Sequence, residues 1–142
     1  MASAGVILGT ALRAYKSVSS VKTAIGHATS FTLDLNRDTL EIADKDNSSN
    51  YKEFLTGQKS ATLTIDAFHS EDTANVDPFD LFDDWDNGTS ITMYASTNVA
   101  GDRELTFSAV LTNVSYTGTV NELATFSITA QVTGTVTKQT IT

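Results

Sequence analysis

The chain has 142 residues, a length that fits one domain with its own core, and it contains no cysteine, which excludes disulfide frameworks and thiolate metal sites. Its 9 Lys and Arg against 17 Asp and Glu give a net charge of −8. This balance argues against a protein that holds nucleic acid by neutralising phosphates, because such proteins cluster Lys and Arg.

Residues 1–26 are expected to form an N-terminal strand or arm, which ends in a turn-rich link over residues 17–26. Residues 6–18 carry apolar side chains on both phases of an extended chain, which indicates a segment covered on two sides. A helix is the alternative, since Ala and Leu are good helix formers. Gly5, Gly9 and the Ser-rich stretch that follows favour the extended conformation. The start lacks a basic region, so a signal peptide is not expected.

The next segments alternate between apolar and polar residues. Residues 28–36 and 39–43 predict two strands of a hairpin, with Asn36-Arg37-Asp38 as the turn between them. Residues 44–58 predict an extended loop, because 46–50 are all turn-forming types. Strict alternation from Ser60 to Phe68 then predicts a half-buried strand.

Residues 77–88 predict a helix. Asp77 is a good N-cap, Pro78 suits the first helical position, and Asn87-Gly88 is a typical end. A helix of this length is marginal on its own in water, so its apolar face must pack on a sheet. The residues of that face are Phe79, Leu81, Phe82 and Trp85.

Three longer strands are expected in the C-terminal part, at about 91–96, 103–117 and 123–137. In the second of them the apolar phase changes, which predicts a bulge near Thr112-Asn113. The last strand has apolar residues on one face and a long uncharged row on the other. That row includes Thr125, Ser127, Thr129, Gln131 and Thr133.

No constellation of residues predicts catalysis. His27 and His69 are the only histidines, and neither stands in a recognisable motif. Asp44-Lys-Asp46 resembles the start of a calcium loop, but the loop's sixth position lacks Gly and its twelfth is Leu55 instead of Glu. The Asp residues of the helix are best explained as its solvated face. We therefore expect a non-enzyme with no metal and no cofactor.

One stretch resembles a known family. Asp44-Lys-Asp46, followed by Tyr51-Lys-Glu-Phe-Leu-Thr-Gly-Gln-Lys59 and an alternating strand, resembles the major tail protein family of long-tailed phages. The chain length and the order of elements are also similar to that family. The resemblance implies a mainly β fold, a β-sandwich or small barrel of antiparallel strands with one flanking helix. The same fold is implied for the inner tubes of contractile tails and of type VI secretion.

The resemblance also implies a function, which is that of a tail tube subunit in the virion. Copies of the chain would stack as hexameric rings into a hollow conduit for DNA ejection, with sheets joined between subunits into one barrel. Further partners implied are a tape measure protein and tail completion or terminator proteins. Genomic DNA would pass without specific binding, no membrane is involved, and synthesis would take place in the cytoplasm of the bacterial host.

Two groups of residues are assigned roles on this basis. The lumen-facing candidates are the polar row of the last strand, for which an ordinary solvent-facing strand is the alternative. The second group should contact a neighbouring subunit, with folding back onto its own core as the alternative. Its members are Tyr51, Lys52, Glu53, Phe54 and Leu55.

Two other functions remain open. The first is the inner tube of a contractile injection system, which would carry effectors instead of DNA. The second is a secreted β-sandwich module that binds carbohydrate or a host surface. Exposed aromatic residues grouped on one face would favour the binding module, whereas most aromatic residues here fall in predicted core positions or in the helix.

Overall fold

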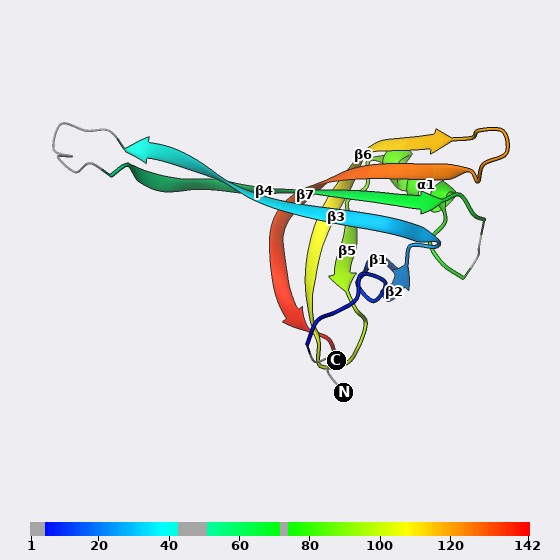
Figure 1. Cartoon of the computed structure of the whole chain (residues 1–142), viewed down its shortest axis with the longest axis horizontal. Coiled ribbons are helices and arrows are strands. Elements are labelled where there is room, and N and C mark those ends of the chain that lie inside the picture. Colours follow the sequence, from blue (N-terminus) through cyan, green and yellow to red (C-terminus); the bar gives the residue numbers. More distant parts are fainter. Residues whose placement is uncertain (1–4, 43–50, 72–73) are drawn as a thin grey trace.

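The computed structural model describes residues 5–42, 51–71 and 74–142 (Figure 1). Within these ranges the chain forms a seven-stranded antiparallel sheet with the order β2-β1-β5-β6-β7-β4-β3, accompanied by helix α1. This confirms the predicted mainly β class with one flanking helix. The elements are β1 (Arg13–Val18), β2 (Val21–Ala24), β3 (Ala28–Ile42), β4 (Glu53–Phe68), α1 (Pro78–Asn87), β5 (Ile91–Ser96), β6 (Arg103–Thr117) and β7 (Thr125–Thr140).

The core lies on one face of the curved sheet. Alternate residues of β4, β6 and β7, such as Leu63, Phe107 and Ile128, are almost completely buried there, as the period of two predicts. Leu81 of α1 closes the core from outside the sheet. The sheet curls far enough that β3, at one end of the strand order, contacts β1, the second strand from the other end.

The predicted hairpin over residues 28–43 is wrong, because β3 runs through Asn36-Arg37-Asp38 as one strand. Its whole length pairs with β4, so the ladder supplies the backbone hydrogen bonds that a turn would have supplied. The turn-like residues mark a register shift between Arg37 and Thr39 instead. Gly57 lies opposite, where an added Cβ would lie 3.0 Å from Asp38 Cβ and 3.2 Å from the Asp38 carbonyl oxygen, so glycine suits this close approach of the two backbones.

The predicted loop 44–58 also needs correction at its C-terminal end. β4 begins at Glu53, seven residues before the predicted strand, and its residues pair with β3 down to Ile42. Residues 44–50 lie outside the described part of the chain. The strand predicted from Ser60 to Phe68 is confirmed as the second half of β4.

The N-terminal expectation is partly wrong as well. Only its second half is extended, as β1, whereas residues 5–12 form no strand. The supposed link over 17–26 contains β2, which pairs with β1 through a two-residue turn. Ser19 and Ser20 have φ values of 50° and 66°, the left-handed pair that a tight hairpin turn requires. Ser-Ser is not the usual sequence signal for such a turn, which is why it was missed.

Helix α1 begins and ends as predicted. The Asp77 side chain accepts a hydrogen bond of 2.9 Å from the Asp80 backbone amide, and Gly88 ends the helix in the left-handed conformation with φ of 64°. The Tyr116 hydroxyl donates to the Pro78 carbonyl at 3.0 Å and so fastens the start of the helix to β6. Burial and the charges of Asp77 and Asp83 raise the pKa of Tyr116 above its ordinary value.

The bulge predicted near Thr112-Asn113 is confirmed by the register shift between Leu111 and Asn113. A second irregularity, which was not predicted, lies in β7, where Thr137 pairs with Thr106 and Thr133 with Ser108. Gly134 lies within it with φ of 81°, a conformation that suits glycine. The strand continues beyond it to Thr140.

Candidate assembly surfaces

A two-stranded arm extends from the sheet. β4 pairs with β7 only from Thr62 to Phe68, so residues 36–42 of β3 and 53–60 of β4 pair with each other alone. These two ranges are called the arm, which projects well beyond the other strands (Figure 1). An isolated two-stranded hairpin is marginally stable at best in water. The arm therefore needs a covering surface.

The arm exposes large apolar side chains on both of its faces. Leu40 and Leu55 are cross-strand partners and expose 63% and 56% of their surface. Phe54, opposite Glu41, exposes 55%. Because adjacent residues of a strand point to opposite faces, Phe54 and Leu55 leave apolar surface on both sides of the ribbon. Tyr51, just before the arm, is 83% exposed.

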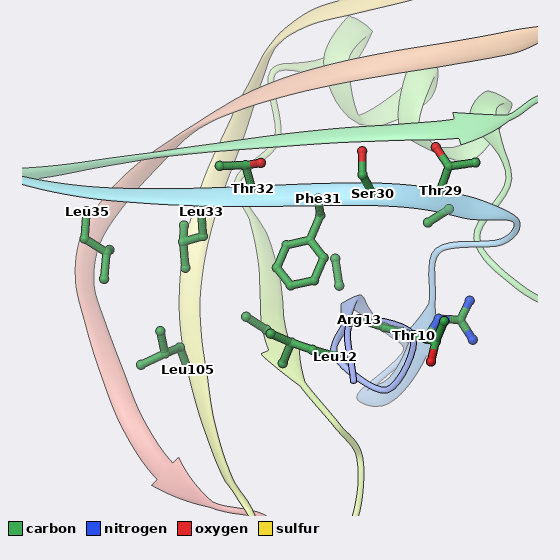
Figure 2. Close-up of a pocket in the computed structure, with 14 residues that line it drawn as sticks. Thr10, Leu12, Arg13, Thr29, Ser30, Phe31, Thr32, Leu33, Leu35 and Leu105 are labelled. Carbon is green, nitrogen blue, oxygen red and sulfur yellow. The ribbon is translucent and has the colours of Figure 1, made fainter. Parts of the chain in front are cut away.

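A groove of about 850 Å³ lies under the other end of β3. Phe31, Leu33 and Leu35 of β3 form one wall, and they point towards Leu12 and Leu105 on the opposite side (Figure 2). Leu35 is 56% exposed and Leu12 is 41% exposed, so the groove leaves apolar surface uncovered. These residues and the others that line it are called the groove. They are Gly9, Thr10, Leu12, Arg13, Ala14, Ala28, Thr29, Ser30, Phe31, Thr32, Leu33, Leu35, Ala95 and Leu105.

The face of the sheet opposite the core carries ordered rows of polar residues. One row crosses four strands, with Thr32 beside Thr64, Thr64 beside Thr129, and Thr129 beside Asn113. The predicted row of β7 is thus one part of a wider surface, which the alternation of a single strand did not reveal. The polar face comprises Ser30, Thr32, Asp34, Asn36, Ser60, Thr62, Thr64, Asp66, Ser108, Asn113, Ser115, Thr117, Thr125, Ser127, Thr129, Gln131 and Thr133, with Val110 opposite Gln131 as an apolar member.

The charges on the polar face are Asp34 and Asp66, and none of its members is Lys or Arg. Thr125, Ser127 and Thr129 are half-buried, while Gln131 and Thr133 are exposed. Gln131 donates a hydrogen bond of 2.9 Å to the Ala61 carbonyl. This surface offers hydroxyl and amide groups to water and repels anions only weakly.

The four strands that form the polar face leave two open edges, one along β3 and one along the C-terminal part of β6. β3 pairs with β4 alone along its length, and the pairing of β5 with β6 stops at Ala109. From Val110 to Thr117, β6 therefore pairs only with β7 within the described part of the chain. Open edges carry unpaired backbone donors and acceptors, which can add a strand of another chain.

The predicted apolar face of α1 is divided between the core and the surface. Leu81 is fully buried, whereas Phe79, Phe82 and Trp85 expose 48%, 40% and 43% of their surface. Phe79 packs edge-on against His69, with 5.4 Å between the ring centroids. The histidine therefore belongs to an aromatic cluster beside the helix. Within the described ranges, no cluster of His, Cys, Asp or Glu that could hold a metal ion is found.

Two ion pairs were missed by the sequence analysis, because nothing in the sequence brings their partners together. Lys22 of β2 donates to Glu104 of β6 at 2.5 Å, and Lys16 of β1 pairs with Asp84 of α1. The Glu104 side chain is only 2% exposed and also accepts from Gln139 at 2.7 Å. Burial raises the pKa of Glu104, but the hydrogen bonds and charge of its partners outweigh burial and leave the pKa below its ordinary value.

These surfaces define a structural β protein built for assembly, with a projecting arm, open sheet edges and a broad polar face. The model of the phage tail tube protein family matches residues 15–138, and the chain belongs to that family. The protein is therefore a component of the phage tail, as the sequence resemblance implied. No helix in the described part of the chain is long and apolar enough to cross a membrane.

Solved structures share this fold at low sequence identity. A chain in the tail of an empty gene transfer agent particle, from a helical refinement with C6 symmetry, gives a TM-score of 0.82 at 13% identity, covering 94% of this chain and 99% of that chain. The SPP1 tail tube gives a TM-score of 0.77 at 15% identity, and the match covers 95% of this chain and 80% of that chain. A chain of the sheath-tube complex of an extracellular contractile injection system gives a TM-score of 0.61 at 21% identity. The match covers 91% of this chain and 89% of that chain. No curated protein matches the sequence significantly.

Proposed function

We propose that copies of this chain stack as hexameric rings into the tail tube, a hollow conduit for DNA ejection. Family membership and the C6 symmetry of the similar gene transfer agent tail support this stoichiometry. The observation that carries the proposal is the polar face with its two open edges. A sheet of this kind, repeated around an axis, closes into a barrel that leaves no edge unpaired.

In this proposal the barrel closes where the free edge of β3 pairs with residues 110–117 of β6 in the next subunit. Each subunit would then contribute the four strands β3, β4, β7 and β6 to the tube wall. The core face of these strands is already occupied by the subunit's own apolar residues. The polar face is the one that remains for the lumen.

The lumen-facing residues proposed are Thr125, Ser127, Thr129, Gln131 and Thr133, together with their cross-strand neighbours. Duplex DNA carries about one negative charge per 1.7 Å of its axis, and each cation that neutralises a phosphate adds affinity. A wall that binds DNA would stop its passage. Hydroxyl groups with a few carboxylates, such as Asp34 and Asp66, keep water at the wall and let DNA slide.

The contact between subunits proposed for Tyr51, Lys52, Glu53, Phe54 and Leu55 is supported by the exposure of the arm. Three of these residues are large and apolar, and each is more than half exposed in the single chain. The tape measure protein within the lumen and the completion or terminator proteins at the tube ends remain proposed partners, consistent with the role of a tube wall. No catalytic role is proposed.

The inner tube of a contractile injection system is the second candidate function. The similarity to the chain of a contractile sheath-tube complex supports it, although that TM-score of 0.61 is below the 0.82 and 0.77 of the two tail structures. The secreted binding module has no support once the family is known. A sheath around the tube in intact particles would favour the contractile system over the phage tail.

Negative-stain electron microscopy of the purified protein tests the proposal. We expect rings or hollow tubes of uniform width. A monodisperse monomer at all concentrations, with no rings or tubes, would contradict it.

A further inference from the structure

We infer that β6 and α1 of the neighbouring subunit in the same ring close the groove, and that Arg13 of the groove pairs there with Asp83 of that neighbour. The inference rests on the proposed function and deepens it, because it names the side-chain contacts beneath the proposed β3–β6 junction. The groove leaves Leu35 56% exposed, so apolar surface there needs a cover. The cover is a second copy of this chain.

Rows of apolar side chains on the core face lead from the groove to β6. One row begins at Phe31 in the groove wall, crosses β4 and β7, and ends at Val114 of β6. A second row begins at Ala28 in the groove and ends at Tyr116 of β6. When β3 pairs with β6 of the next copy, each row continues across the junction. The groove residues then lie beside Val114 and Tyr116 of the neighbour, as cross-strand partners on one face do.

The two ends of these rows do not meet within one chain. β7 and β4 separate β6 from β3 in the strand order, which at about 4.8 Å per strand places the two strands roughly 14 Å apart. Tyr116 lies on the open part of the β6 edge and is 43% exposed. The groove therefore lacks a wall that the open end of β6 in another copy can supply.

Helix α1 accompanies β6 as part of that wall. The Tyr116 hydroxyl holds the start of the helix through the Pro78 carbonyl. The helix has no Lys or Arg, so the Asp residues of its second half face the negative end of the helix dipole without a cation on the helix itself. Lys16 of β1 compensates Asp84. Asp83 is exposed and has no ion pair within the described ranges.

The groove supplies the cation that Asp83 lacks. Arg13 is the only charged residue that lines the groove, and its guanidinium lies near Thr29, at the end where β3 begins (Figure 2). This is the end at which Tyr116 of the neighbour is expected. Burial, and then the charges of Asp77 and Asp83, raise the pKa of Tyr116, so Asp83 lies close to that ring.

Arg13 has donors to spare for this pair. It donates one hydrogen bond, from Nη2 to the Ile25 carbonyl at 3.2 Å, and a guanidinium has five N–H donors. In a chain of net charge −8, a pair between Arg13 and Asp83 of the neighbour offsets the repulsion between copies.

A charge swap tests the pair. Sedimentation of tubes gives the concentration needed for assembly of Arg13→Glu, Asp83→Arg and the double variant, and circular dichroism checks that each subunit is folded. The matched control is Arg13→Glu with Glu122→Arg, which has the same net charge but places the new cation on the turn between β6 and β7. The neutral variants Arg13→Gln, Asp83→Asn and their double repeat the test without charge reversal.

We expect each single reversal to raise the assembly concentration about tenfold or more, and the swapped pair to return to within about threefold of the unmodified protein. The control should stay as weak as Arg13→Glu, and the neutral double variant should assemble no worse than the weaker of its singles. Full additivity of the single losses would overturn the pair, and so would equal rescue by Glu122→Arg.

A crosslink tests whether the contact lies within one ring. A heterologous contact closes into a ring or continues as an open filament, depending on its rotation. The chain has no cysteine, so Leu33→Cys with Val114→Cys places one thiol in the groove and one on β6. Assembled tubes are treated with a short bismaleimide and separated by denaturing electrophoresis, with each single cysteine variant as a control.

We expect a ladder of covalent oligomers that ends at one closed ring. A ladder that continues beyond a ring would overturn the inference, as would tubes of normal form with neither a ladder nor a rescue by the charge swap. Both results leave the proposed function intact. If the unmodified protein forms no tubes, the proposed function fails, and the inference fails with it.

Discussion

Replacing Phe54 by Asp is the most direct perturbation of the arm. Fully burying a Phe side chain contributes roughly 1.5–3 kcal/mol, and Phe54 is already about half buried, so the contact with a neighbour contributes about 1 kcal/mol per subunit. A carboxylate held in the same apolar contact adds a desolvation cost of about 1–3 kcal/mol. The total loss is about 2–4 kcal/mol per subunit.

Because each 1.4 kcal/mol is a factor of about ten, the concentration needed for assembly should rise by about 30- to 700-fold. Sedimentation of tubes over a protein concentration series measures this value, and circular dichroism checks that the variant subunit is folded. Phe54→Leu is the matched control, since it keeps an apolar side chain and should assemble near the normal concentration. A Phe54→Asp protein that forms tubes at the normal concentration would refute the role given to the arm.

Three further changes test other parts of the structure. Leu81→Ala truncates the fully buried residue that joins α1 to the core. Thermal or urea unfolding should show that the free energy of unfolding falls by about 2–5 kcal/mol. A decrease of less than about 1 kcal/mol would contradict that packing. Glu104 has a lowered pKa in the folded protein, so its contribution to stability is complete above the ordinary carboxyl pKa and is lost as the pH falls through the folded-state pKa. Glu104→Gln should therefore lower the free energy of unfolding by about 1–3 kcal/mol near pH 7 and make it fall less steeply at acid pH. A free energy of unfolding with the same pH dependence as that of the unmodified protein would contradict the ion pair. Thr129→Lys should leave tubes intact but make them retain DNA at low salt and release it at high salt, whereas Thr129→Gln should not; equal DNA retention by the two would argue against a lumen position.

The parts of the fold that the sequence predicted are those in which local pattern and tertiary structure agree. Helix α1 has its cap at Asp77 and its stop at Gly88, and both depend on neighbours within the same segment. β7 and the second half of β4 alternate because one face of each is buried. The bulge near Thr112 was visible because it reverses the phase of the apolar residues within one strand.

The wrong predictions fall where pairing between strands overrides the local conformational preference of the sequence. Asn36-Arg37-Asp38 has the composition of a turn, yet β4 pairs on both sides of it and keeps β3 extended. The arm is a consequence of this pairing. No local pattern predicts it, because the sequence assigns its residues partly to a hairpin and partly to a loop. The groove and the Lys22–Glu104 pair join residues distant in the chain, which no local pattern predicts.

The central claim is that the polar face of β3, β4, β7 and β6 lines a tube made of this chain. A cryo-electron microscopy reconstruction of tubes assembled from the purified protein tests it most directly. The account predicts a continuous barrel in which Thr64 and Thr129 face the lumen and β3 of one subunit pairs with β6 of the next. A reconstruction in which the polar face points outward, or in which the sheets of neighbouring subunits do not join, would contradict it.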